Sequence, residues 1–156
     1  MDKQISAFAS EVHEMFMQDL LECFEEVFVD LARESMKQSI KHNVYSKYRP
    51  GAYVRRRENG GLIADENIFV EVYRDKTTGN IIGYVKNITE GVGNAYELDE
   101  VIESGIGYDW EDSKIFNLQP FPRPFYDDTI VRIEKANWLW KVRKKMQERG
   151  WRAVGK

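Results

Sequence analysis

The sequence predicts an α+β fold: a long N-terminal helix, a small and mainly antiparallel sheet, a short helix, and a long C-terminal helix packed on the sheet. Three observations carry this prediction. Residues 2–48 contain no glycine or proline, residues 67–74 alternate in polarity between turn sequences, and the last quarter of the chain returns to helical spacing. A chain of 156 residues can bury one core, so we expect a single domain over 1–156.

The first 48 residues form the N-terminal helical region, because their apolar residues follow a 3–4 spacing. Pro50 disfavours helix at the residue before it, so the helix should end by Tyr48, with an interruption expected near residues 35–39. Phe24 and Phe28 lie off the apolar stripe, and they make the apolar surface of the helix wider than a single contact with the core requires. We therefore place both in a candidate subunit interface. The stripe itself consists of Ile5, Phe8, Val12, Met15, Phe16, Leu20, Cys23, Val27 and Leu31.

Strands are expected within residues 52–88. Residues 52–57 form a short strand candidate, and Glu58-Asn59-Gly60-Gly61 a turn. Residues 67–74 show the period of two that is typical of a half-buried strand. Thr78-Gly79-Asn80 then predicts a hairpin turn that leads into a partner strand over 81–88.

Two helices complete the expected fold. A short acidic helix over 96–104 is closed by Gly105, within the region 96–105. The second long helix covers 125–149, since two aspartates stand at its start, basic residues gather near its end and Gly150 follows. Pro122 and Pro124 have a fixed φ that limits how the chain enters this helix, so we expect them, with Phe125, to anchor the helix on the sheet.

The apolar residues of this last helix cover more than one side. One face can serve the core, and a second face with Trp138 or Trp140 would suit a subunit interface, where tryptophan is enriched. The alternative is a deeply buried helix. Both interpretations stay open.

Charge is segregated into blocks although the net charge is only −3. The net charges are −7 over 1–32, +7 over 33–57, −10 over 58–128 and +7 over 129–156. Such blocks can pair within one fold or between neighbouring copies. A pI near 5.5 argues against wholesale DNA binding. Arg55, Arg56 and Arg57 could still contact phosphate, the simpler interpretation being salt bridges to acidic segments.

No residue pattern predicts a catalytic, cofactor-binding or metal site. The acidic residues Asp109, Glu111 and Asp112, with Glu97, Asp99, Glu100 and Glu103 upstream, are expected to form a solvated acidic face. His13 and His42 lie elsewhere, in the first helical region. Cys23 lies on an apolar stripe and is expected to be a buried thiol. A single cysteine, no secretory signal and no membrane-spanning run indicate a reducing compartment, so the Asn87-Ile88-Thr89 sequon is expected to be a chance match.

Four features together resemble the head–tail joining or tail-completion (neck) proteins of long-tailed bacteriophages. One is the long N-terminal helix, and another is the hairpin that begins at Asn67-Ile68. A third is the run VYSKYRPGAYVRRRENGGL over 44–62, which resembles the Tyr-x-x-Tyr-x-Pro-x-x-Tyr-x-Arg run and glycine turn of members from phages of Gram-positive hosts. The fourth is the pair Ile102-Glu103-x-Gly105 and Pro122-Arg123-Pro124-Phe125 before the last helix. The loop over 107–119 and the acidic first helix depart from this pattern.

This resemblance implies a structural virion protein without enzymatic activity, assembled as a ring at the head–tail junction and present in the host cytoplasm during assembly. Its partners would be copies of itself, other phage neck and tail proteins and, transiently and without sequence preference, passing DNA, with no membrane. The alternative is a cytoplasmic oligomeric adaptor with a minor nucleic-acid contact.

Overall fold

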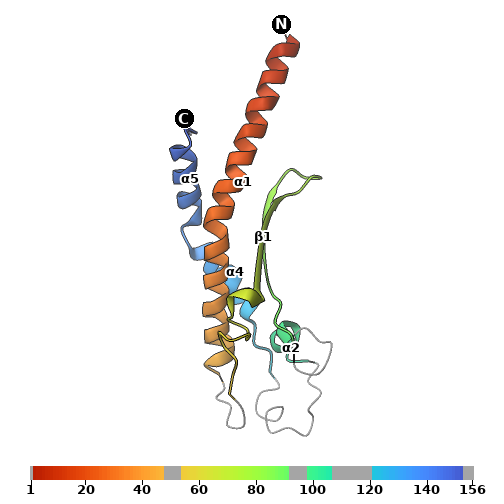
Figure 1. Ribbon diagram of the computed structural model, residues 1–156, viewed down its shortest axis with the longest axis vertical. Helices are drawn as coiled ribbons and strands as arrows, with labels where there is room; N and C mark the ends of the chain where they lie inside the picture. Colours follow the sequence, from red (N-terminus) through yellow and green to blue (C-terminus); the bar gives the residue numbers. More distant parts are fainter. Residues whose placement is uncertain (1, 48–53, 92–97, 107–120, 153–156) are drawn as a thin grey trace. The chain divides into compact units, whose positions relative to one another are not determined.

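The computed structural model describes residues 2–47, 54–91, 98–106 and 121–152 (Figure 1). Its elements, in chain order, are α1 (Asp2–Ile40), a π-helical turn (Lys41–Tyr45), a 3-10 turn (Asp65–Asn67), β1 (Ile68–Arg74), β2 (Ile81–Asn87), α2 (Leu98–Ser104), α4 (Phe125–Lys135) and α5 (Trp138–Glu148). The α+β class is confirmed. The sheet has two strands, with β1 paired to β2.

The first helix is continuous, so the interruption expected near residues 35–39 is wrong. Met36 and Ile40 are fully buried in one cluster, and this packing outweighs the weaker helix propensity of the serines beside them. The helix then widens into the π-helical turn, which closes where the Ser46 N–H donates to the Lys41 carbonyl at 2.9 Å.

The hairpin follows the expected register. Ile68, Val70 and Val72 are more buried than the residues between them, as the alternating pattern predicts. The backbone N–H of Asp75 donates to the Asn80 carbonyl at 2.8 Å, and Gly79 takes a φ of 73° in the turn. The predicted hairpin is confirmed.

The strand expected over 52–57 does not form in its described part, Val54–Arg57. This segment instead enters the turn over 58–61, in which the Gly61 N–H donates to the Arg57 carbonyl at 3.0 Å. A Cβ on Gly61 would lie 2.5 Å from backbone atoms of Arg57, so this tight turn needs glycine.

The C-terminal helical region is two helices rather than one. Ala136 is extended, with a ψ of 138°, and its N–H donates to the carbonyls of Arg132 and Ile133 at the end of α4. Asn137 then precedes α5. The short α2 is described from Leu98, and Gly105 follows it with a φ of 72°, as predicted.

The chain divides into two compact units, each with its own core. Unit 1 comprises Met1–Asp30, Glu71–Tyr84 and Asn137–Lys156, and unit 2 comprises Leu31–Val70 and Val85–Ala136. The core of unit 1 is built on Cys23, Val27, Val142 and Met146. The core of unit 2 is built on Met36, Ile40, Val44, Leu62, Ile63, Ile68, Ile102 and Phe125. The expectation of one domain over 1–156 stays a prediction.

Candidate assembly surfaces

The two short motifs of the phage resemblance meet in unit 2, where the end of α2 holds the start of α4. Glu103 Oε2 accepts hydrogen bonds from the backbone N–H groups of Phe125 at 2.8 Å and Tyr126 at 3.2 Å. The Arg123 N–H donates to the Ile102 carbonyl at 3.0 Å. A carboxylate from another helix thus satisfies N–H groups that the first turn of a helix leaves without partners. The paired motifs form one structural element.

Phe125 lies at the centre of this element. Its side chain is fully buried in the core of unit 2 with Ile68, and its ring stacks on that of Tyr126 at 4.6 Å between centroids. Pro124 precedes α4 with a φ of −68°. α4 therefore packs at the base of the sheet, where the Asn87 N–H donates to the Tyr126 hydroxyl at 2.9 Å.

A buried polar chain continues from Tyr126, and the sequence did not predict it. The Tyr126 hydroxyl donates to Asp99 Oδ2 at 2.6 Å, the Asn87 amide donates to the Leu62 carbonyl at 2.7 Å, and the Thr89 hydroxyl donates to Asn87 Oδ1 at 2.6 Å. Asn87, Thr89 and Asp99 are at most 1% exposed. The sequon residues are thus a buried structural pair, and a solvated role for Asp99 is wrong because Tyr126 draws it into the interior.

Glu103 is also not a solvated carboxylate. The pKa of Glu103 is raised, and burial is the main cause. The nearby charges of Asp127 and Asp99 also raise this pKa, whereas the hydrogen bonds from the two N–H groups of α4 act in the opposite direction. Glu97, Asp109, Glu111 and Asp112 lie outside the residues that the structure describes.

In unit 1 an ion-pair cluster joins α5 to α1. The Arg149 guanidinium donates to Asp19 at 2.9 Å, to Glu22 at 2.6 Å and to Glu26 at 3.1 Å. Lys145 contacts Glu26 at 2.5 Å, and the indole N–H of Trp151 donates to Asp19 at 2.7 Å. For these residues, the acidic first block and the basic last block pair within one chain.

These contacts hold the carboxyl groups in their ionised form. Hydrogen bonds from Trp151 and then Arg149 lower the pKa of Asp19. Hydrogen bonds from Gln18 and Arg149 lower the pKa of Glu22, and Lys145 is the main cause of the lowered pKa of Glu26.

Three of the four predicted interface residues pack inside unit 1. Phe24 lies 5.3 Å from Trp138 and 5.0 Å from Phe28 between ring centroids. Phe28 is 7% exposed, and its ring lies against Gly83 of the hairpin. Trp140 differs, because 57% of it is exposed.

Trp140 belongs to a basic and apolar surface that we call the α5 outer face, made of Leu139, Trp140, Arg143 and Lys144. Leu139 is 66% exposed, and both basic residues are exposed. The Lys144 ammonium lies 5.8 Å from the Trp140 ring centroid. Trp138, Val142 and Met146 occupy the opposite side of α5, toward α1.

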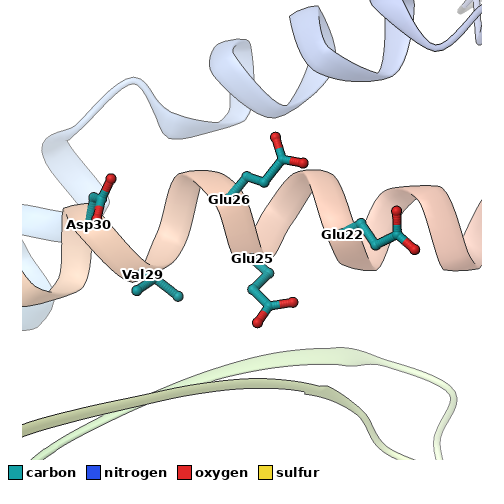
Figure 2. A pocket seen from close by; sticks show the side chains of 5 residues that line it. All are labelled: Glu22, Glu25, Glu26, Val29 and Asp30. Atoms are coloured by element: carbon teal, nitrogen blue, oxygen red, sulfur yellow. The ribbon is translucent and has the colours of Figure 1, made fainter.

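A second surface lies on α1, and we call it the α1 acidic face. It is a shallow hollow lined by Glu22, Glu25, Glu26, Val29 and Asp30. Figure 2 shows Glu26 pointing toward α5, while Glu25 and Val29 point to the other side of the helix, toward the hairpin. The hollow therefore lies on the side of α1 that is between α5 and the hairpin in unit 1.

The three predicted DNA-facing arginines line the segment before the turn in unit 2. Arg55 donates to the Tyr45 carbonyl at 2.8 Å, and its guanidinium lies 5.0 Å from the Tyr45 ring centroid. Arg56 donates to the Glu90 carbonyl at 2.9 Å. Arg57 lies 5.9 Å from the same tyrosine ring and has a φ of 48°. Two of these arginines thus bind backbone carbonyls, and Arg56 and Arg57 remain exposed.

Cys23 is fully buried, and burial raises the pKa of its thiol, so the predicted buried thiol is confirmed. Within the described ranges, no three His, Cys, Asp or Glu side chains are arranged to hold a metal ion. No helix in that part of the chain combines the length and apolar character needed to cross a membrane.

The fold and these surfaces define a small α+β protein whose exposed features are charged and apolar helix faces. The sequence model of the YomN family matches residues 5–149, and the chain belongs to this phage-derived family. No curated protein and no solved structure matches the chain. The resemblance to phage proteins is thereby confirmed at this level, and the narrower neck or tail-completion assignment stays a prediction.

Proposed function

We propose that this phage protein is a structural virion component, a neck or tail-completion protein that forms a ring at the head–tail junction. The observation that carries the proposal is the match of a phage-derived family over residues 5–149. The chain acts in this role without enzymatic activity. Its partners are copies of itself and the neighbouring neck and tail proteins.

The architecture of the two units supports this role. The Glu103 cap and the buried Tyr126–Asp99 hydrogen bond fix the start of α4 in unit 2. In unit 1, α5 is tied to α1 by the Arg149 cluster yet presents Leu139 and Trp140 to solvent. A ring component needs such exposed faces on a fixed framework, because each copy must contact two neighbours in one defined geometry.

The arginine cluster supports a limited contact with DNA that passes through the ring. Arg56 and Arg57 are exposed and positively charged, which is sufficient for phosphate contacts without sequence preference. The acidic total charge fits this role, since a passage must not hold the genome tightly.

Deletion of the gene from the phage or inducible prophage that carries it tests the proposal. Electron microscopy of the lysate should show filled heads and tails that are not joined, and the complemented strain should restore joined particles that contain the protein. Joined, infective particles without the protein would contradict the proposal. Oligomers found in the cytoplasm and absent from particles would favour the adaptor instead.

A further inference from the structure

We infer that copies of this chain associate head to tail, with the α5 outer face of one copy docked on the α1 acidic face of the next. This inference rests on the proposed ring-forming function, because that function requires copies of the chain to associate.

The α5 outer face has the composition of a docking surface. Trp140 and Leu139 expose 57% and 66% of their surface, and aromatic residues and arginine are enriched where proteins meet. Arg143 makes no ion pair with any residue that the structure describes. Lys144 has only Glu148 at 4.0 Å, an exposed pair of little energetic weight. The positive charge of this face is therefore left for a partner.

The α1 acidic face is the complement of this surface. Glu25 and Asp30 are exposed, and neither has an ion-pair partner among the described residues. Val29 lines the same hollow and provides apolar surface for a side chain such as Trp140. Glu22 and Glu26 lie at the edge toward α5, where Arg149 already pairs with them. The free negative charge thus belongs to Glu25 and Asp30.

A second copy is the occupant that this charge pattern selects. The α5 outer face points away from α1, because the opposite side of α5 packs on it through Val142 and Met146. The two surfaces of one chain therefore cannot meet each other. The acidic face extends for about 12 Å along α1 and the α5 outer face for about 8 Å along α5, so the bases of one can lie within the length of the other. Contacts between two different patches close into a ring when the rotation allows.

Charge reversal on both surfaces tests the inference. One variant carries Arg143→Glu with Lys144→Glu, and the other carries Glu25→Lys with Asp30→Lys. Sedimentation velocity should show self-association weakened at least about tenfold in each variant alone, because like charges then face each other. An equimolar mixture of the two variants should regain the association of the unmodified chain. The control is Glu134→Lys with Lys135→Glu, which reverses two exposed charges on α4 and leaves the net charge unchanged.

Several outcomes would overturn the inference. These are association that neither variant changes, variants that the mixture does not rescue, or a chain that stays monomeric. Loss of DNA binding by the Arg143 and Lys144 variant with unchanged association would assign this face to nucleic acid. Thermal melting of each variant confirms that the units are folded. The proposed function fails separately, when particles join without the protein.

Discussion

Glu103 of α2 caps α4, because its Oε2 accepts the backbone N–H of Phe125 at 2.8 Å. The cap comes from a residue 22 positions earlier in the chain, and α4 has no side-chain cap of its own at Pro124. The start of α4 therefore depends on α2. This dependence explains why the two short motifs occur together.

Removal of the cap should destabilise unit 2. Glu103→Ala leaves two N–H groups without an acceptor, and we expect it to lower the free energy of unfolding by about 1 kcal/mol. Glu103→Gln keeps an acceptor oxygen and should cost less. Urea denaturation at neutral pH measures both, and equal losses in the two variants would argue against the cap.

The pH dependence of the same residue has a defined sign. Burial raises the pKa of Glu103 in the folded chain, so the folded state holds this proton more tightly than the unfolded state. The stabilisation that the Glu103 carboxyl group contributes is fully present below its pKa in the unfolded chain. It is lost as the pH rises through the raised pKa of the folded chain. The stability of the unmodified chain relative to Glu103→Gln should therefore fall as the pH rises through this window. A difference that is constant with pH would contradict the raised pKa.

Phe125 should be the costliest aromatic residue to truncate in this region. Its side chain is fully buried, so Phe125→Ala should lower the free energy of unfolding by about 3–5 kcal/mol. Phe121 is the matched control, because it is 66% exposed and Phe121→Ala should change stability little. Denaturation midpoints that do not separate the two variants would remove the anchoring role.

Acid should loosen unit 1 through the Arg149 cluster. The lowered pKa values of Asp19, Glu22 and Glu26 mean that their stabilisation is present above the ordinary carboxyl values, about 4, and is lost as the pH falls. Amide hydrogen exchange in α5 should accelerate over this range. Arg149→Gln should raise exchange at neutral pH and flatten its pH dependence.

Lys141→Gln is the control for this experiment, since it removes the same charge from an exposed position on α5. The Lys145 and Trp151 contacts remain in the Arg149 variant, so the pH dependence should be reduced and not abolished. An unchanged profile in Arg149→Gln would show that the cluster does not hold α5.

Gly83 should tolerate no side chain while Phe28 is in place. A Cβ at Gly83 would lie 2.6 Å from Phe28 Cε1, and the buried ring cannot leave without exposing its surface. We expect Gly83→Ala to cost about 1–3 kcal/mol. In a Phe28→Leu background the same change should cost less, and a double-mutant cycle measures this coupling. Additive effects would contradict the contact.

Local patterns predicted the elements that local interactions determine. The first helix follows from a long run without glycine or proline, and the hairpin from its alternation and the Thr78-Gly79 turn. The break at Ala136 could not be predicted, because alanine favours helix. It arises where α4 joins the core of unit 2 and α5 that of unit 1.

The candidate sites depend on contacts between residues that are far apart in the sequence. Asp99 looked like a surface acid, yet Tyr126, 27 residues later, draws it into a buried chain. The charge blocks predicted that acidic and basic segments would pair, but not that Arg149 would bind Asp19 across 130 residues. After the pairing within one chain, Glu25, Asp30 and Arg143 are among the described residues that have no ion pair.

The arginine segment gives a prediction for DNA passage. Arg55 and Arg56 bind the carbonyls of Tyr45 and Glu90, so replacing all three arginines would also disturb the fold of this segment. Arg57→Gln is the cleaner change. We expect normal particle assembly with less DNA retained or delivered, because one exposed charge for phosphate contact is lost. Packaged and delivered DNA per particle is the measurement.

Lys76→Gln is the control, since it removes an exposed charge from the hairpin turn of unit 1. DNA contact through Arg57 predicts an effect that is specific to the arginine variant, with an unchanged melting temperature. The competing account has the arginines neutralising acidic groups of the same or an adjacent subunit. It predicts loss of folding or assembly before any DNA passes. Equal DNA delivery by the two variants, with assembly intact, would remove the arginine segment from the path of the genome.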